Sequence, residues 1–434
     1  MRYDPVDPEL FVRNRARLSA LLKGNSMAIL HSNDVMPTNA DGTMPWKQNS
    51  DLYYLSGIDQ EESVLILYPD AAEPRDREIL FIRETSGQLA IWEGEKLSKA
   101  QATELSSVAN VKWTSGFKST LHRLIQQAEH VYFNINEHLR AEMAVETRDA
   151  RLLKQCKETY PLHKYARLAP LMHRLRIIKD QEEVRMIQKA CNITGVGFRR
   201  VLNFVRPGVG EWEIEAEYIH EFLRHKSMGF AYSPIIASGK NACVLHYIKN
   251  NRVCQDGDLL LMDVAAEYGN WNSDMTRTIP VNGKFSKRQR EVYDAVLRVL
   301  RKCNEILRPG ITPRDYQNQT IELVEAELIG LGLIDATEAS QQDGDKALVK
   351  KYFMHSTSHH LGLDVHDVCP QNEPYAEGMV LTIEPGIYIP EENIGVRLEN
   401  NVVIGKDENL DLMGNIPIEA GEIEALMAAN TATS

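Results

Sequence analysis

The sequence predicts a chain of two domains, an α/β domain followed by a larger α+β domain. Its 434 residues exceed what one hydrophobic core usually organises, so about two domains are expected. In the first 175 residues, short apolar runs alternate with helical patterns, which is typical of an α/β arrangement. Beyond that point, helical patterns come first and paired strand patterns follow. This order favours α+β over a parallel doubly wound sheet, and we place the domains at 1–175 and 176–434.

The strands expected in the first domain are short apolar runs bounded by turn residues. In chain order they are SMAILH (26–31), ESVLILYPD (62–70), REILFIR (77–83), LAIWEG (89–94) and HVYFNI (130–135). Helical patterns lie between them, and the first covers residues 8–23. This domain carries no obvious chemical motif.

The second domain opens with a long helix that starts after Asp180 and ends at Arg206-Pro207-Gly208. Apolar residues recur near one stripe of this helix, namely Val184, Ile187, Cys191, Val201, Leu202 and Val205. Further along, residues 259–281 and 380–405 each read as two strands around a turn. These two segments are the expected hairpins of the domain.

Composition argues against several classes of protein. The net charge is −12 and no basic run is visible, so a nucleic-acid partner is not expected. The longest apolar runs are far shorter than a membrane span, and the N-terminus lacks the apolar region of a signal peptide. The 6 cysteines form no CxxC pair, which fits a reducing compartment. We therefore expect a cytoplasmic protein with no membrane partner.

The first hairpin carries two carboxylates that a symmetric register brings together. If the chain turns at Tyr268-Gly269, counting outward places Asp263 directly opposite Asp274. Directly opposed side chains share a face and lie about 4.5–5.5 Å apart at Cβ. Two like charges in that position repel, so something positive is expected between them.

The second hairpin repeats this device. If its turn is Glu391-Glu392, Glu384 lies opposite Glu399. A slip of one residue would move either set to the other face. Arg397, two residues before Glu399, would share its face on a strand.

Histidines are crowded in one further segment, MHSTSHHLGLDVHD, which holds His355, His359, His360 and His366. Four carboxylates and one imidazole suit a pair of divalent ions, whose charges would balance. Such a pair, about 3.5–4 Å apart, activates a bridging water and polarises a carbonyl. Taken singly, each residue has a structural alternative: a solvated strand aspartate, a turn at Glu384-Pro385-Gly386, or packed histidines.

As a set and in this order, these residues resemble the metallopeptidases of the pita-bread fold. The strings LLLMDVAAEY, SDMTRTIPVNG, MHSTSHHLGLDVHDV, VLTIEPGIYIP and GVRLENNVVI are similar to those of the aminopeptidase P family. The segments QNSDLYYLSGIDQEESVLILYPD and IWEG, and the ending IPIEAGEIEALM, extend the resemblance over nearly the whole chain. The resemblance implies an α/β N-terminal domain that restricts substrate access through oligomer contacts, and a pita-bread catalytic domain.

The resemblance also implies a role for each residue of the set. Asp263 would chelate one metal, Asp274 and Glu399 would bridge both, and His359 and Glu384 would bind the other. Family precedent favours two Mn²⁺ ions, while the sequence leaves Co²⁺, Fe²⁺ and Zn²⁺ open. Glu384 would also act as general base towards the bridging water.

Further active-site residues follow from the same resemblance. His246, His355 and His366 would contact the scissile carbonyl and the tetrahedral intermediate, and Arg397 would orient a carboxylate or the substrate. His360 has no such role and is expected to pack. Trp92 is similar to a tryptophan that closes the pocket of a neighbouring subunit.

The implied activity is removal of the first residue from Xaa-Pro peptides, by attack of a metal-bridging hydroxide on the Xaa-Pro amide, in a homodimer or homotetramer. Prolidase, which cleaves only Xaa-Pro dipeptides, shares the fold and ligands and is the main alternative. Methionine aminopeptidase does not need the long N-terminal domain. Creatinase-like enzymes and non-catalytic binding modules lack ligands that this chain keeps.

The chain departs from the family pattern at three places. Ser356 stands where glycine is common, and Val264-Ala265 follow Asp263 where Ala or Gly is frequent. Asn400-Asn401 replace a frequent acidic pair after Glu399. None of these removes a ligand.

Overall fold

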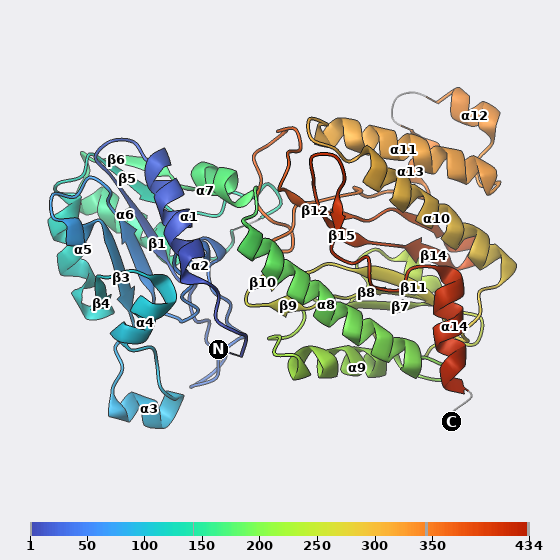
Figure 1. Ribbon diagram of the computed structural model, residues 1–434, viewed down its shortest axis with the longest axis horizontal. Helices are drawn as coiled ribbons and strands as arrows, with labels where there is room; N and C mark the ends of the chain where they lie inside the picture. The colour runs from blue at the N-terminus through green and yellow to red at the C-terminus, as the bar shows by residue number, and fades with distance from the viewer. Residues whose placement is uncertain (1, 142, 343–345, 432–434) are drawn as a thin grey trace. The chain divides into compact units, whose positions relative to one another are not determined.

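The structure is a computed structural model that describes residues 2–141, 143–342 and 346–431. The chain forms two compact units, one of residues 3–176 and one that starts at Ile177. Each unit is described by itself below (Figure 1).

The first unit is a mixed six-stranded sheet with strand order β4-β3-β2-β1-β5-β6. β1 runs antiparallel to β2 and parallel to β5. The strands are β1 (Ser26–His31), β2 (Val64–Leu67), β3 (Glu78–Ile82), β4 (Val111–Trp113), β5 (His130–Phe133) and β6 (Lys164–Arg167). The helices are α1 (Pro8–Leu21), α2 (Ser50–Ser56), α3 (Gly87–Glu93), α4 (Lys99–Ser106), α5 (Phe117–Ile125), α6 (Arg148–Thr159) and α7 (Ala169–Arg176).

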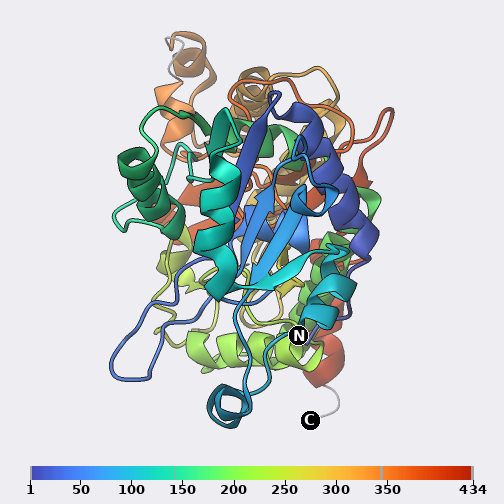
Figure 2. The same ribbon diagram turned by 90° about the vertical axis from the view of Figure 1, so that its left-hand side faces the viewer.

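Apolar strand residues explain why this sheet is covered by helices. One core cluster joins β1–β3 and β5 to Leu121, Leu124 and Ile125 of α5. A second cluster joins Leu80 and Ile82 of β3 to the α4 region. The α/β prediction for this domain is confirmed, and Figure 2 shows α5 and α6 in front of the sheet.

One expected strand of this unit is wrong. LAIWEG lies in and just after helix α3, where Ser86 caps the N-terminus by accepting a hydrogen bond from the Leu89 amide. Ile91 and Trp92 are each 82% exposed. The apolar run is therefore not part of the sheet, and its side chains are too exposed for burial to favour a strand.

The second unit has helices on both sides of its strands, with α8 and α9 on one side and α10 and α11 on the other (Figure 1). Its helices are α8 (Gln181–Phe204), α9 (Glu211–Arg224), α10 (Lys287–Ile306), α11 (Pro313–Gly330), α12 (Ala336–Ser340), α13 (Ala347–Lys350) and α14 (Ala420–Thr431). Its strands are β7 (Ile235–Ser238), β8 (Leu259–Asp263), β9 (Glu267–Tyr268), β10 (Trp271–Asn272), β11 (Thr276–Pro280), β12 (Val380–Ile383), β13 (Gly386–Ile389), β14 (Ile394–Arg397), β15 (Asn400–Val403) and β16 (Leu410–Asp411).

Helix α8 begins where the sequence predicts. The Asp180 side chain accepts a hydrogen bond from the Glu182 amide in the first turn of the helix. The Glu183 side chain accepts one from the Asp180 amide, which completes a capping box. The strands that follow pair antiparallel, as β11-β8-β7, β12-β15-β16 and β13-β14. The α+β prediction for this part is confirmed.

Two further features bear on environment. Within the described residues, no helix combines the length and the hydrophobicity needed to cross a bilayer. All the cysteines are free thiols.

Candidate metal centre

The first hairpin turns one residue later than the sequence count assumed. Glu267 pairs with Asn272 and Tyr268 with Trp271, so the turn residues are Gly269 and Asn270. Their φ angles are 60° and 71°. A two-residue hairpin turn of type I′ needs positive φ at both positions, which glycine and asparagine adopt readily.

This turn shifts the register of the hairpin by two residues. Asp263 pairs with Thr276, so the predicted direct pairing of Asp263 with Asp274 is wrong. Because side chains alternate with a period of two, a two-residue shift keeps them on the same face. Asp274 is therefore a diagonal neighbour of Asp263 rather than its direct partner.

The register predicted for the second hairpin is confirmed. Ile383 pairs with Asn400 on one side, and Gly386 pairs with Arg397 on the other. In this register Glu384 and Glu399 face each other between the two ladders. The hairpin brings both carboxylates to one point from residues 15 apart in the sequence.

His359 lies in an irregular segment whose backbone is tied to β12. Its amide donates to Thr382 Oγ1 at 3.1 Å, and its carbonyl accepts from the Thr382 amide at 3.0 Å. The ring Nδ1 is 3.0 Å from the carbonyl oxygen of His360. Because a carbonyl only accepts, Nδ1 carries a proton and donates it, which leaves Nε2 to face the cluster.

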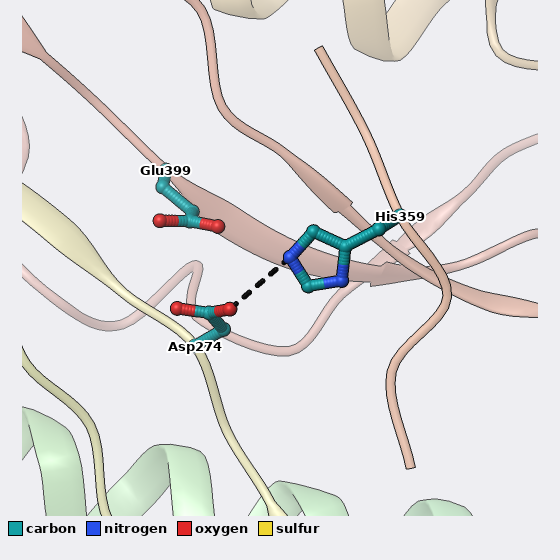
Figure 3. A group of neighbouring side chains, drawn as sticks. All are labelled: Asp274, His359 and Glu399. Atoms are coloured by element: carbon teal, nitrogen blue, oxygen red, sulfur yellow. Dashed lines mark ion pairs between the residues drawn. The ribbon is translucent and has the colours of Figure 1, made fainter. Parts of the chain in front are cut away.

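The Nε2 atom points at the carboxylates of both hairpins. It lies 3.3 Å from Asp274 Oδ2 and 3.7 Å from Glu384 Oε1. One possible ligand atom from each of Asp274, His359 and Glu399 lies within 4.8 Å of the others. Figure 3 shows these three side chains converging from separate elements.

Burial makes this group of charges unfavourable without a cation. Burial, reinforced by neighbouring carboxylates, raises the pKa of Glu384 to about 7 and raises that of Glu399 well above its usual value. The pKa of Asp263 is also raised by burial, against the opposing effect of Arg397. Burial alone would lower the pKa of His359, but Asp274 and Glu384 raise it to about 9.

A divalent cation fits this donor set. Glu399 Oε1 is buried and has no hydrogen-bond partner among the described residues. A buried charged oxygen without a partner is costly, and a metal ion would satisfy it. Carboxylates suit ions such as Mg²⁺, Ca²⁺ and Mn²⁺, while imidazole suits Zn²⁺ and Fe²⁺, so the donor set is compatible with several divalent ions.

Asp263 accepts hydrogen bonds from two residues that do not belong to the group of Asp274, His359 and Glu399. Tyr232 donates its hydroxyl to Oδ1 at 2.6 Å, and Arg397 Nη2 donates to Oδ2 at 2.7 Å. Thr276 donates to Glu399 Oε2 at 2.7 Å and accepts from Arg397 Nε at 3.1 Å. Arg397 therefore contacts the Asp263 carboxylate directly, and Thr276 links Arg397 to Glu399.

Arg397 also begins a chain of hydrogen bonds towards His355. Its Nη1 donates to the Tyr388 hydroxyl at 3.0 Å, and that hydroxyl lies 2.8 Å from His355 Nε2. His355 Nδ1 lies 2.9 Å from the carbonyl of Ser356, so Nδ1 donates and Nε2 accepts. Burial lowers the pKa of His355 to about 4, which keeps the ring neutral.

The remaining candidates lie at different distances from this centre. The His366 ring centroid is 4.0 Å from that of His359, and the His366 side chain is exposed. His246 is exposed and close enough to His355 to contribute to its lowered pKa. His360 is buried, with its ring 5.9 Å from Tyr375. Trp92 belongs to the other unit.

Sequence reasoning missed Tyr232, Thr276 and Tyr388. The correct turn would have found Thr276, because it puts this residue opposite Asp263. Tyr388 lies on β13 in the second hairpin, but the sequence spacing between Tyr388 and Arg397 does not indicate a hydrogen bond between them. Tyr232 precedes Asp263 by 31 residues and gives no local signal.

Comparisons with known proteins match both parts of the chain. Residues 185–406 match the model for metallopeptidase family M24, and residues 11–132 match the aminopeptidase P N-terminal domain. The chain is 34% identical to the Xaa-Pro aminopeptidase of Escherichia coli K12 over 98% of both chains. It is 32% identical to that of Haemophilus influenzae, over 96% of this chain and 97% of the relative.

Solved structures give the same picture for the fold. Aminopeptidase PepP of Pseudomonas aeruginosa superposes with a TM-score of 0.89 at 30% identity, over 99% of both chains. Zinc-substituted aminopeptidase P of E. coli in complex with product superposes with a TM-score of 0.86 at 31% identity, over 98% of this chain and 99% of that one. The second unit therefore has the fold that its sequence implied.

Proposed function

The chain belongs to metallopeptidase family M24, as a relative of the Xaa-Pro aminopeptidases, and we propose that it removes the N-terminal residue from peptides with proline second. It is a metal-dependent hydrolase by this membership. The observation that carries the proposal is the convergence of Asp274, His359 and Glu399, with one Glu399 oxygen buried and without a hydrogen-bond partner in the described part of the chain. Asp263 and Glu384 complete the set, which would hold two divalent ions, most directly Mn²⁺.

The chain's own residues would hold and orient the reacting groups. The bound ions would supply a water acidic enough to attack the Xaa-Pro amide carbon as hydroxide near neutral pH. Glu384 would take the proton of that water. The neutral ring of His355 would act through Tyr388, which leaves His246 and His366 as the exposed histidines that can face a peptide carbonyl.

Proline in the second position explains why a dedicated peptidase is needed. The Xaa-Pro amide has no N–H, so a site that reads a backbone donor there rejects it. An exopeptidase also needs a partner for the free α-amino group. The carboxylates of this centre offer one where an ion leaves an oxygen free.

The N-terminal domain, residues 1–175, would restrict access to the catalytic domain, residues 176–434. Trp92 supports this assignment, because Trp92 and its neighbour Ile91 are each 82% exposed on helix α3 and together form an apolar surface that a partner would cover. That partner would be a second copy in a homodimer or homotetramer. The free cysteines support work in a reducing compartment, the cytoplasm.

The test compares two substrates on the same enzyme. Metal-stripped protein is reconstituted with Mn²⁺ and given Arg-Pro-Pro and Arg-Pro, with release of arginine followed by mass. Cleavage of the tripeptide supports aminopeptidase P activity. Cleavage of the dipeptide alone would assign prolidase activity at the same site. Cleavage of neither peptide by protein that binds metal would refute the proposed substrate class.

A further inference from the structure

Asn401 holds the main chain of Asp274 with both ends of its side-chain amide. The side chain is fully buried on β15. Its Oδ1 accepts from the Asp274 amide at 2.9 Å, and its Nδ2 donates to the Asp274 carbonyl at 2.6 Å. One amide therefore satisfies both main-chain groups of a residue 127 positions away.

Asn401 lies on the sheet next to other residues that hold the proposed ligands. Asn401 pairs directly with Thr382 across β12 and β15. Thr382 also bonds both main-chain groups of His359: its Oγ1 accepts from the His359 amide, and its own backbone amide donates to the His359 carbonyl. Glu384 and Glu399 lie two residues away from this pair, on the same face. One sheet face thus supplies two of the site carboxylates and anchors the backbones of two other site residues.

Glu399 has a main-chain anchor of its own. Arg277 is fully buried, and its Nη1 donates to the Glu399 carbonyl at 2.7 Å. Its Nη2 donates to Asn400 Oδ1 at 2.7 Å, while Asn400 Nδ2 donates to Asp411 at 2.6 Å. Asn400 therefore lies between a buried arginine and an aspartate. Its side-chain amide can accept from the first and donate to the second.

An amide at position 401 does what a carboxylate cannot. An ionised aspartate could accept from the Asp274 amide, but it has no hydrogen to donate to the Asp274 carbonyl. It would also add a negative charge behind a cluster that is already crowded with them. An amide side chain therefore matches both contacts that residue 401 makes.

We propose that Asn401 is a positioning residue that fixes the backbone of Asp274 relative to Glu399, and so sets the spacing of the two carboxylates for metal. The inference rests on the proposed function in one respect, that these residues bind metal. It makes no use of the substrate. Partners of metal ligands typically change metal affinity by about 10- to 100-fold when removed.

Asn409 provides a matched control in the same unit. It is also buried and bonds to main chain, accepting from the Gly405 amide at 3.3 Å and donating to the Leu307 carbonyl at 2.9 Å. None of its partners is a proposed ligand. Asn401→Ala and Asn409→Ala therefore lose comparable contacts, and only the first loses them at the metal centre.

The experiment measures metal binding without turnover. Mn²⁺ affinity is measured by calorimetry on the parent, Asn401→Ala and Asn409→Ala, together with the visible spectrum of the Co²⁺ forms and the Tm of the metal-free proteins. Both variants should lower Tm. Only Asn401→Ala should weaken Mn²⁺ binding by about 10- to 100-fold and change the Co²⁺ spectrum.

Equal Mn²⁺ affinity and identical Co²⁺ spectra in all three proteins would overturn the role of Asn401. If the parent itself binds no metal, the proposed function fails instead, so the two failures are distinguishable. If Asn401→Ala does not fold, Asn401→Ser keeps a hydroxyl at the site and is titrated with the same expectation.

Discussion

Thr276 is the residue whose removal most sharply tests how the centre is held. Thr276→Val keeps the shape of the side chain but removes its hydroxyl. Glu399 Oε2 then loses the donor at 2.7 Å, and Arg397 Nε loses its acceptor at 3.1 Å. Both bonds involve a charged group in a buried site, so neither is replaced by bulk water.

The magnitude follows from the lost bond to the carboxylate. A hydrogen bond to a charged group contributes about 1.5–3 kcal/mol. At about 1.4 kcal/mol for each factor of ten, this corresponds to roughly a 10- to 100-fold loss in Mn²⁺ affinity and in kcat/KM. Thr276→Ser keeps the hydroxyl and should stay within about 3-fold of the parent, a difference of about 0.7 kcal/mol.

The assay is Mn²⁺ titration of metal-free protein by calorimetry, with kcat/KM on Arg-Pro-Pro measured at saturating metal. A Val variant that matches the Ser variant in both quantities would refute the reasoning, because the hydroxyl would then contribute nothing to the centre.

Three further predictions concern the same centre. Asp274→Asn should reduce activity by more than the roughly 10- to 100-fold expected for an outer partner, and full activity at saturating Mn²⁺ would rule out a bridging role. Tyr232→Phe should weaken Mn²⁺ binding by about 10-fold while Arg397 still holds Asp263, and calorimetry with an unchanged affinity would contradict this. The metal-free protein should lose stability from about pH 7 to 9, because the folded pKa of His359, about 9, lies above its ordinary 6.5. The stabilisation that the charged His359 ring contributes is complete below its ordinary pKa of 6.5 and is lost as the pH rises through the folded pKa of about 9. Saturating Mn²⁺ should reverse this slope, since metal binding releases the proton, and a Tm of metal-free protein that is flat over this range would refute the effect.

Much of the fold follows from local sequence signals. The α8 helix starts at an aspartate with a glutamate three residues on, and these two form the capping box that the pattern indicates. The second hairpin has the expected register because its apolar runs flank a single turn region. LAIWEG shows the limit of such signals, since a short apolar run adopts a helix when no sheet edge receives it.

The sequence indicated residues that the structure brings together, namely Asp274, His359 and Glu399, but not the contacts among the elements that carry them. The first hairpin slipped by two residues because turn type depends on which positions accept positive φ, and Gly269-Asn270 fits better than Tyr268-Gly269. The hydrogen bonds between Asn401 and Asp274 join residues that are 127 positions apart, and no sequence pattern indicates that the two lie together. Such contacts arise only when two separate hairpins pack.

We propose that five side chains, Asp263, Asp274, His359, Glu384 and Glu399, hold two metal ions between the hairpins. A crystal structure of the Mn²⁺-loaded protein, with anomalous data collected near the manganese edge, tests it most directly. We expect two anomalous peaks about 3.5–4 Å apart, with Asp274 and Glu399 contacting both and His359 contacting one. A single peak, or peaks away from these residues in protein that is active with Mn²⁺, would contradict the claim.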